Sequence, residues 1–270
     1  MKDPVHDHRI RLSALACDLD GTLTDADRRV SLPALDCLMR LIQRGVRVIP
    51  ASGNTVCFMD AFCRLVGSEG TLIAENGGVY RIGYTGPLRV SGDRNAAWET
   101  FHLLESHFLG QGKTLELYSP NYRFSDVAFA RTVPVDEVRA VLGGTPITVV
   151  DTGFAIHLQS PGISKGTALR ALAEELRLPL EQVMAVGDSA NDVEMIEVAG
   201  VGAAVANSHP SLRVVADMVA EKEYGDGFIE AVRPSRWWIP ALPSTCSRPA
   251  SARVPRCGPW QKSWGYLWTV

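Results

Sequence analysis

The sequence predicts an α/β fold, with a doubly wound parallel sheet as its core and a small α+β domain inserted between the two halves of that core. Two observations predict it. Apolar strands alternate with amphipathic helices at both ends of the chain, and a stretch of alternating apolar and polar residues lies between them. Near-continuous apolar strands are typical of parallel sheets that are covered on both faces. Strict alternation is typical of an antiparallel sheet with one solvated face.

The first half of the core begins with an apolar strand that ends at Cys17. An amphipathic helix follows, because Ser31 can cap its N-terminus, apolar residues recur at helical spacing and Gly45 ends it. Three further elements are expected: a strand over 46–52, a helix over 55–66, and a strand with a turn over 71–78.

The inserted domain is expected over residues 84–155, where alternating segments and short turns predict an antiparallel sheet with two helices. The core therefore has two parts, 1–83 and 156–234. The expected elements of the insertion are helices over 93–108 and from 135, and strands over 113–119, 124–131, 146–151 and 154–160.

The second half of the core returns to strand and helix alternation, with helices at 164–176 and 190–199, strands at 183–189 and 201–206, and a final helix pair that ends near Val232. Beyond it, residues 235–270 are rich in Pro, Ser, Arg and Trp without any periodicity. We predict that this tail is disordered, with an aromatic arm that docks on a neighbouring surface as the alternative.

The composition narrows the choice of partner and compartment. A net charge of −3, with both signs spread along the chain, offers no basic face for nucleic acid and no polybasic membrane patch. No apolar stretch approaches the roughly 20 residues of a membrane helix. We expect a cytoplasmic monomer or homodimer that binds neither nucleic acid nor membrane. The six histidines show no ligand spacing, and His157 and His209 are expected to be structural.

Four groups of polar residues follow core strands or begin a helix, and in open parallel sheets ligands collect at the carboxyl ends of the strands. We expect the four groups to form one site for phosphoryl transfer. Their members are Asp18 and Asp20; Ser52, Gly53 and Asn54; Lys165; and Asp188 with Asp192.

The two carboxylates of the first group suggest the chemistry. Residues i and i+2 of a strand point to the same face, so Asp18 and Asp20 would place like charges side by side. That arrangement is unfavourable unless a positive charge lies between them. Asp18 can act as a nucleophile, and Asp20 as general acid and then base. Asp188 can join Asp18 in holding a hard cation, for which Mg²⁺ is suited.

The four groups, in this order, resemble the motifs of the haloacid dehalogenase superfamily, whose core is Rossmann-like. The resemblance rests on DLDGT at 18–22, ASGN at 51–54, SKG at 164–166 and GDSANDVEM at 187–195, and it covers about residues 12–82 and 155–232. The insertion resembles the α/β cap that some members carry between their second and third motifs. Such a cap closes over the site and excludes water.

The resemblance implies a role for each group. Asp18 would form an aspartyl-phosphate, and Asp20 would protonate the leaving alcohol and later activate water. Mg²⁺ would be bound by Asp18, the main-chain carbonyl of Asp20 and Asp188, with Asp192 in the metal site directly or through water. Ser52, Gly53 and Asn54 would bind phosphate. Lys165 would bind phosphate too and would also steady the nucleophile.

Within the superfamily, the chain most resembles the archaeal-type phosphoglycolate phosphatases, because Ser-Gly-Asn replaces the arginine-containing second motif of many sugar-phosphate members. The predicted reaction is hydrolysis of 2-phosphoglycolate to glycolate and phosphate, so the expected partner is a small phosphorylated metabolite. The alternatives are a sugar-phosphate phosphatase or phosphomutase, and a non-catalytic binding protein that uses the aromatic tail. Asn54, Asn76 and Asn191 are either turn formers or ligand contacts.

Overall fold

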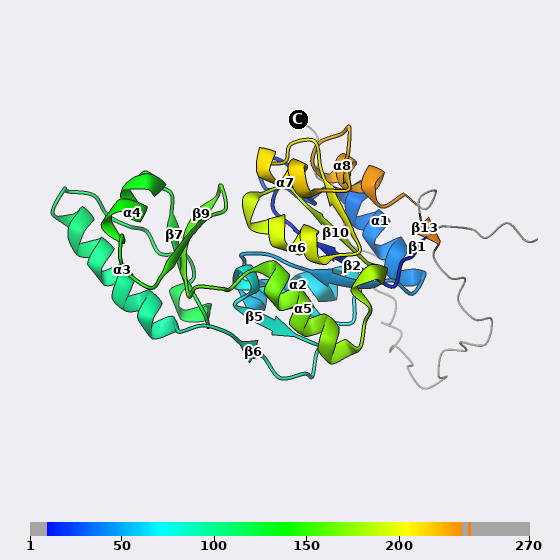
Figure 1. Ribbon diagram of the computed structural model, residues 1–270, viewed down its shortest axis with the longest axis horizontal. Coiled ribbons are helices and arrows are strands. Elements are labelled where there is room, and N and C mark those ends of the chain that lie inside the picture. The colour runs from blue at the N-terminus through cyan, green and yellow to red at the C-terminus, as the bar shows by residue number, and fades with distance from the viewer. Residues whose placement is uncertain (1–9, 234–236, 239–270) are drawn as a thin grey trace, which may run out of the picture. The chain divides into compact units, whose positions relative to one another are not determined.

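A computed structural model describes residues 10–233 and 237–238 (Figure 1). The core is a sheet of five parallel strands in the order β12-β11-β10-β2-β3. The predicted fold class is confirmed. In register, Cys17 pairs with both Pro50 and Val186, so the carboxyl ends of three strands meet at one edge. The strands are β2 (Ala14–Cys17), β3 (Arg47–Pro50), β10 (Val183–Gly187), β11 (Val201–Ala204) and β12 (Met218–Val219).

Helices cover both faces of this sheet, as the alternation of side chains along β2 requires. Leu15 and Cys17 pack into one apolar cluster, and Ala14 and Ala16 into the other. The first cluster takes in α1 (Leu32–Gln43), α2 (Val56–Val66) and α8 (Tyr224–Ala231), and the second α5 (Lys165–Leu176), α6 (Val193–Val198) and α7 (Pro210–Val215). The short helices η3 (Leu180–Gln182) and η4 (Ala190–Asp192) precede β10 and α6.

A three-stranded antiparallel sheet extends the first half of the core. It consists of β4 (Leu72–Ala74), β5 (Val79–Arg81) and β6 (Arg89–Val90), with the short helix η1 (Glu75–Gly77) between the first two strands. A single parallel bridge between Ala51 and Ile73 joins it to β3. The sequence predicted only the first of these strands, and pairing continues beyond residue 83, where the insertion was expected to begin.

The inserted domain, called the cap below, has an antiparallel sheet in the order β7-β9-β8 that packs on one long helix. Its interior is aromatic, with Phe101, Phe108 and Phe129 fully buried. The last cap strand runs beyond the predicted boundary at residue 155. The elements are α3 (Arg94–Leu109), η2 (Pro120–Tyr122), β7 (Val127–Ala130), α4 (Val135–Val141), β8 (Thr148–Asp151) and β9 (Ala155–Gln159).

One predicted strand of the cap does not form. Residues 113–119 make only a bridge between Leu117 and Phe129. Gly112 and Ser119 have φ of 74° and 52°, in the left-handed region, and Pro120 follows. These residues bend the backbone at both ends of the segment and prevent a regular ladder.

The predicted tail mostly lies outside the described residues. The prediction of disorder is wrong at Trp237–Trp238 (β13), which pairs in parallel with Ile10–Arg11 (β1).

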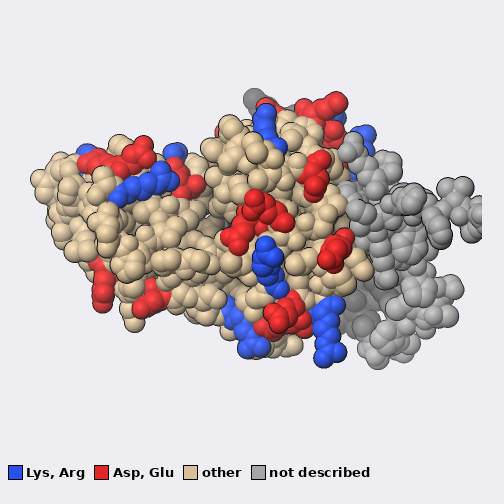
Figure 2. All heavy atoms as spheres, in the orientation of Figure 1, with Lys and Arg blue, Asp and Glu red and all other residues tan. Residues whose placement is uncertain are grey.

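On the face drawn in Figure 2, acidic and basic side chains are interspersed, as the mixed charge of the sequence leads one to expect. Across residues 10–233, every helix is too short or too polar to cross a bilayer.

Candidate active site

A buried ion-pair cluster lies at the carboxyl end of β2. The Nζ atom of Lys165 is 2.5 Å from Oδ1 of Asp18 and 2.6 Å from Oδ1 of Asp192. All three residues are at most 4% exposed. The sequence placed them in three separate motifs, and the structure brings them into direct contact.

Local structure explains how Lys165 reaches the cluster. It is the first residue of α5, whose N-terminus is closed by a capping box between Ser164 and Thr167. A cation at this end opposes the helix dipole, so the neighbouring carboxylates must stabilise it. Burial by itself lowers the pKa of Lys165, but the charges and hydrogen bonds of Asp18 and Asp192 outweigh burial and raise it.

Asp188 completes an acidic group with Asp18 and Asp192. One carboxylate oxygen from each lies within 4.8 Å of the others. Thr22 donates a hydrogen bond of 3.1 Å to Asp188. Gly21 packs against the same carboxylate: its φ is 90°, and a Cβ there would lie 2.3 Å from Oδ2 of Asp188. The turn within the first motif therefore requires glycine at position 21.

The charges of this group do not balance. Three carboxylates face one ammonium group, which leaves two negative charges when all are ionised. Burial and the negative charge of Asp192 therefore raise the pKa of Asp188 to about 7. Burial also raises the pKa of Asp18 well above its usual range, although Lys165 opposes the shift.

The donor set fits a divalent cation. Oδ2 of Asp18 is buried and has no hydrogen-bond partner within the described part of the chain. All the candidate ligand atoms are carboxylate oxygens, which hard cations such as Mg²⁺ prefer. The Oδ2 of Asp192 accepts from the backbone N–H groups of Asp188 and Ser189, at 3.1 and 3.0 Å. Asp192 thus also holds the loop that carries Asp188.

The second motif lies beside Asp20. Asn54 donates through Nδ2 to Oδ2 of Asp20 at 2.7 Å and to Oγ of Ser52 at 2.9 Å. Ser52 is buried, and its hydroxyl also accepts from the backbone N–H of Asn54 at 3.1 Å. The structure thus brings Ser52, Gly53 and Asn54 to the first motif, where they line the same cavity as Asp18 and Asp20.

Asp20 has different surroundings from Asp18. Its side chain is 23% exposed, and besides Asn54 it faces Nε of Arg28 at 3.6 Å. Asp18 is instead buried against Lys165. One carboxylate is therefore held by a buried ammonium, while the other reaches solvent and can exchange a proton. Two carboxylates in contrasting environments are typical of a nucleophile and an acid–base pair.

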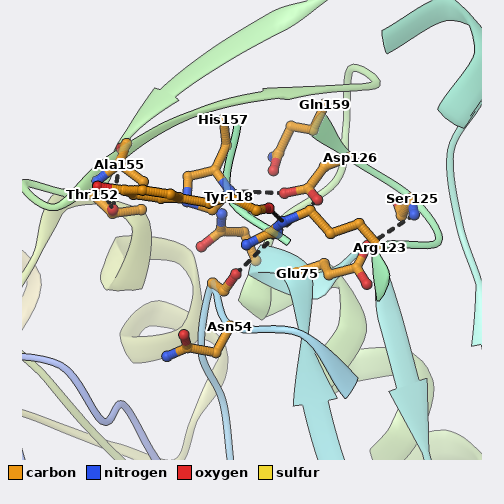
Figure 3. A network of polar contacts seen from close by, with 12 residues as sticks. Asn54, Glu75, Tyr118, Arg123, Ser125, Asp126, Thr152, Ala155, His157 and Gln159 are labelled. Carbon is orange, nitrogen blue, oxygen red and sulfur yellow. Dashed lines mark hydrogen bonds and ion pairs between the residues drawn. The ribbon is translucent and has the colours of Figure 1, made fainter. Parts of the chain in front are cut away.

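A second polar network lies in the cap, and the sequence did not predict it (Figure 3). It consists of Arg123, Asp126 and His157, all buried, and both Arg123 and His157 line the cavity. The expectation that His157 is merely structural is therefore revised. His209 does have the expected structural role, because its side chain caps α7. Of the three asparagines, Asn76 has a φ of 54°, the left-handed backbone of a turn former. Asn54 contacts Asp20, and Asn191 contacts Asn76 at 2.9 Å; their role as ligand contacts stays a prediction.

Comparison with known proteins agrees with this geometry. The family model of haloacid dehalogenase-like hydrolases matches residues 15–85 and 137–232. The chain belongs to this family. The predicted family and enzyme class are confirmed, and membership of a hydrolase family argues against the non-catalytic alternative.

Relatives of this hydrolase named phosphoglycolate phosphatase occur in archaea. The protein of Methanoculleus marisnigri is 54% identical over 224 residues, which cover 82% of this chain and 96% of the relative. That of Methanothermobacter thermautotrophicus is 43% identical over 227 residues, 84% of this chain and 100% of the relative.

Solved structures show the same fold. A crystal structure from Thermoplasma acidophilum has a TM-score of 0.72 at 24% identity and covers 82% of this chain and 96% of that one. A haloacid dehalogenase-like hydrolase from B. subtilis has a TM-score of 0.66 at 20% identity, with 82% and 100% covered. At these identities the two structures support the fold of core and cap.

Proposed function

We propose that this hydrolase is a Mg²⁺-dependent phosphatase that converts 2-phosphoglycolate to glycolate and phosphate through an aspartyl-phosphate at Asp18. The observation that carries the proposal is the pairing of Asp18 with Lys165 at 2.5 Å, with the second carboxylate oxygen of Asp18 left without a partner within the described residues. The names of the archaeal relatives support the choice of substrate.

In the first step, a carboxylate oxygen of Asp18 attacks phosphorus, and the bond between phosphorus and the glycolate oxygen breaks. Asp20 gives its proton to the departing alkoxide. Asn54 holds Asp20 through its 2.7 Å hydrogen bond. Lys165 and the hydroxyl of Ser52 bind the non-bridging phosphate oxygens and stabilise the negative charge of the transferring phosphoryl group.

In the second step, Asp20, now a carboxylate, takes a proton from a water molecule that attacks phosphorus. The bond between phosphorus and the Asp18 oxygen breaks, phosphate leaves, and Asp18 is restored as a carboxylate. Asp18, Asp188 and the carbonyl of Asp20 would hold Mg²⁺, with Asp192 acting directly or through water. When bound, the ion offsets the negative charge of substrate and carboxylates.

Replacement of Asp18 by Asn tests the proposal. The expected result is that phosphate release from 2-phosphoglycolate with Mg²⁺ falls roughly 10³-fold or more. Asp36→Asn is the matched control, because Asp36 is 62% exposed on α1 and, among the described residues, pairs only with Arg40. Acid quenching of the wild type should trap a hydroxylamine-sensitive phosphoenzyme that Asp18→Asn lacks. Full turnover in Asp18→Asn would exclude Asp18 as the nucleophile.

The same assay distinguishes the other members of the superfamily. A phosphomutase needs a bisphosphate activator and returns a phosphorylated product, whereas a phosphatase releases phosphate without one. A sugar-phosphate phosphatase would hydrolyse hexose phosphates more efficiently than 2-phosphoglycolate. Either result would replace the proposed substrate and leave the roles of Asp18 and Lys165 intact.

A further inference from the structure

The cavity above Asp18 has two kinds of wall. Its volume is about 780 Å³. The motif residues form one wall, and cap residues form most of the other, among them Leu117, Tyr118, Tyr122, Arg123, Phe154 and His157. The core motifs can bind a phosphate in any ester, so discrimination between esters must come from the other wall, to which Arg28 of the core also contributes.

Arg123 is the buried cation of that wall, since only 7% of the residue is exposed. Its Nε donates to the carbonyl of Tyr118 at 3.0 Å, and its Nη1 to the carbonyl of Gly53 at 3.2 Å and to Oδ1 of Asp126 at 2.8 Å. An arginine carries five N–H donors, two of them on each Nη. Within residues 10–233, the donors of Nη2 have no hydrogen-bond partner.

Asp126 fixes the orientation of both cap groups. Its Oδ1 accepts from Arg123, and its Oδ2 lies 2.8 Å from Nδ1 of His157. Burial by itself raises the pKa of Asp126, but the hydrogen bond from His157 and the charge of Arg123 outweigh burial and lower it. Because an ionised carboxylate only accepts, Nδ1 of His157 must carry the proton. Nε2 of His157 has no partner among the described residues.

The core holds this network at a fixed distance from the phosphate motif. Gly53, whose carbonyl accepts from Arg123, lies directly after Ser52. A Cβ on Gly53 would lie 2.9 Å from Oδ1 of Asn76 and 3.3 Å from Cε1 of His157. The buried carboxylate of Glu75 accepts from the backbone N–H groups of Phe124 and Ser125, which fastens the loop after Arg123 to η1.

We propose that Nη2 of Arg123 binds the carboxylate of a short phosphorylated acid whose phosphate lies against Asp18. The assignment rests on the proposed function. Arginine forms strong charge-assisted hydrogen bonds with carboxylates, and a partly desolvated guanidinium rejects a substrate that leaves it unpaired. Arg123 therefore makes the phosphatase selective for esters with an acid group close to the phosphate.

Arg28 is the other cation that lines the cavity, and it is less suited to this role. Its side chain is 45% exposed, faces Asp20 at 3.6 Å and stacks over the ring of Phe154 at 4.2 Å. It is therefore engaged by a carboxylate and an aromatic ring of the enzyme, and solvent weakens its attraction for a substrate. The experiment below distinguishes the two cations.

The test compares kcat/KM for 2-phosphoglycolate with that for 2-hydroxyethyl phosphate, in which a hydroxymethyl group replaces the carboxylate. The wild type should prefer 2-phosphoglycolate. In Arg123→Gln the ratio of the two kcat/KM values should fall roughly 10- to 100-fold, chiefly through a higher KM for 2-phosphoglycolate. Lys113→Gln is the control, because it removes the same charge from an exposed cap position that does not line the cavity.

The outcomes distinguish an error in the proposed substrate from an error in the role of Arg123. If the wild type hydrolyses both esters equally well, the proposed substrate is wrong. If it prefers 2-phosphoglycolate and Arg123→Gln keeps that preference, the proposed function stands and the assignment of Arg123 fails. A ratio that falls only in Arg28→Gln assigns the carboxylate to Arg28.

A milder variant covers the case in which Arg123→Gln does not fold. Arg123→Lys keeps the charge beside Asp126, but one ammonium group cannot replace the planar fork that serves Gly53, Asp126 and the substrate together. Its ratio should fall by several-fold, and an unchanged ratio would overturn the assignment.

Discussion

Lys165 and Asp18 form a buried ion pair of 2.5 Å between the first residue of α5 and the residue that follows β2. A second carboxylate, that of Asp192, lies 2.6 Å from the same ammonium group. Removal of one partner from a buried pair leaves the other charge uncompensated, which costs far more than loss of an exposed pair. Lys165 thus balances part of the negative charge of the site, and in the proposed reaction it also binds phosphate.

Lys165→Met should lower kcat/KM for 2-phosphoglycolate by roughly 10²- to 10³-fold, because it removes a fixed positive charge from the phosphate. Metal-free stability should also fall, since Asp18 and Asp192 lose their counter-charge. Steady-state kinetics and urea unfolding measure the two effects. Arg170→Met, at an exposed position of the same helix, is the control for loss of a cation. Equal kinetics for the two variants would contradict the role of Lys165.

Asp188→Asn should weaken Mg²⁺ binding by at least about 10-fold, because a neutral amide replaces one of three clustered carboxylates. Isothermal titration with MgCl₂ measures the effect directly. Excess chelator should abolish turnover of the wild type, and added Mg²⁺ should restore it. Asp217→Asn, outside the acidic group, is the control. Unchanged Mg²⁺ affinity in Asp188→Asn would exclude this carboxylate as a ligand.

The sequence revealed the core side of the site because each motif is local. Asp18, Ser52 and Asp188 each follow an apolar strand, and strand ends can be recognised from neighbouring residues alone. Parallel pairing then brings those ends together.

The cap side could not be predicted in this way. Arg123 contacts Gly53 across 70 positions, and Asp126 contacts His157 across 31. No spacing along the chain encodes these contacts, which depend on how the cap sheet meets the core. One signal was available: Arg123, Asp126 and His157 lie in or beside segments that alternate apolar and polar residues.

Asn54→Ala should lower kcat for 2-phosphoglycolate roughly 10-fold, because Asp20 loses the 2.7 Å hydrogen bond that holds it toward the leaving group. The loss should be smaller for p-nitrophenyl phosphate, whose leaving group needs little protonation. Comparison of kcat for the two substrates separates a role in acid catalysis from a role in phosphate binding. An equal loss with both substrates would favour phosphate binding alone. Asn95→Ala, exposed on α3 of the cap, is the control.

Glu75 should make the stability of the protein depend on pH. Burial, with the charge of Asp126 adding to it, raises the pKa of Glu75 from 4.5 to about 7, although hydrogen bonds from Ser125 and Phe124 and the charge of Arg123 oppose the shift. Between these two values the unfolded chain has lost this proton and the native protein keeps it. The free energy of unfolding therefore falls as pH rises through that window, by up to about 1.4 kcal/mol per pH unit.

Glu75→Gln removes this titration while keeping a carbonyl oxygen for the backbone N–H groups of Phe124 and Ser125. Urea unfolding at about pH 5 and about pH 8 should show a smaller loss of stability in the variant than in the wild type. Glu137→Gln is the control: a hydrogen bond from Gln111 lowers the pKa of Glu137, so this group stays ionised across the window. An identical pH dependence in Glu75→Gln and the wild type would mean that Glu75 is already ionised in the native protein at pH 5. The backbone hydrogen bonds would then outweigh the cost of burying its charge.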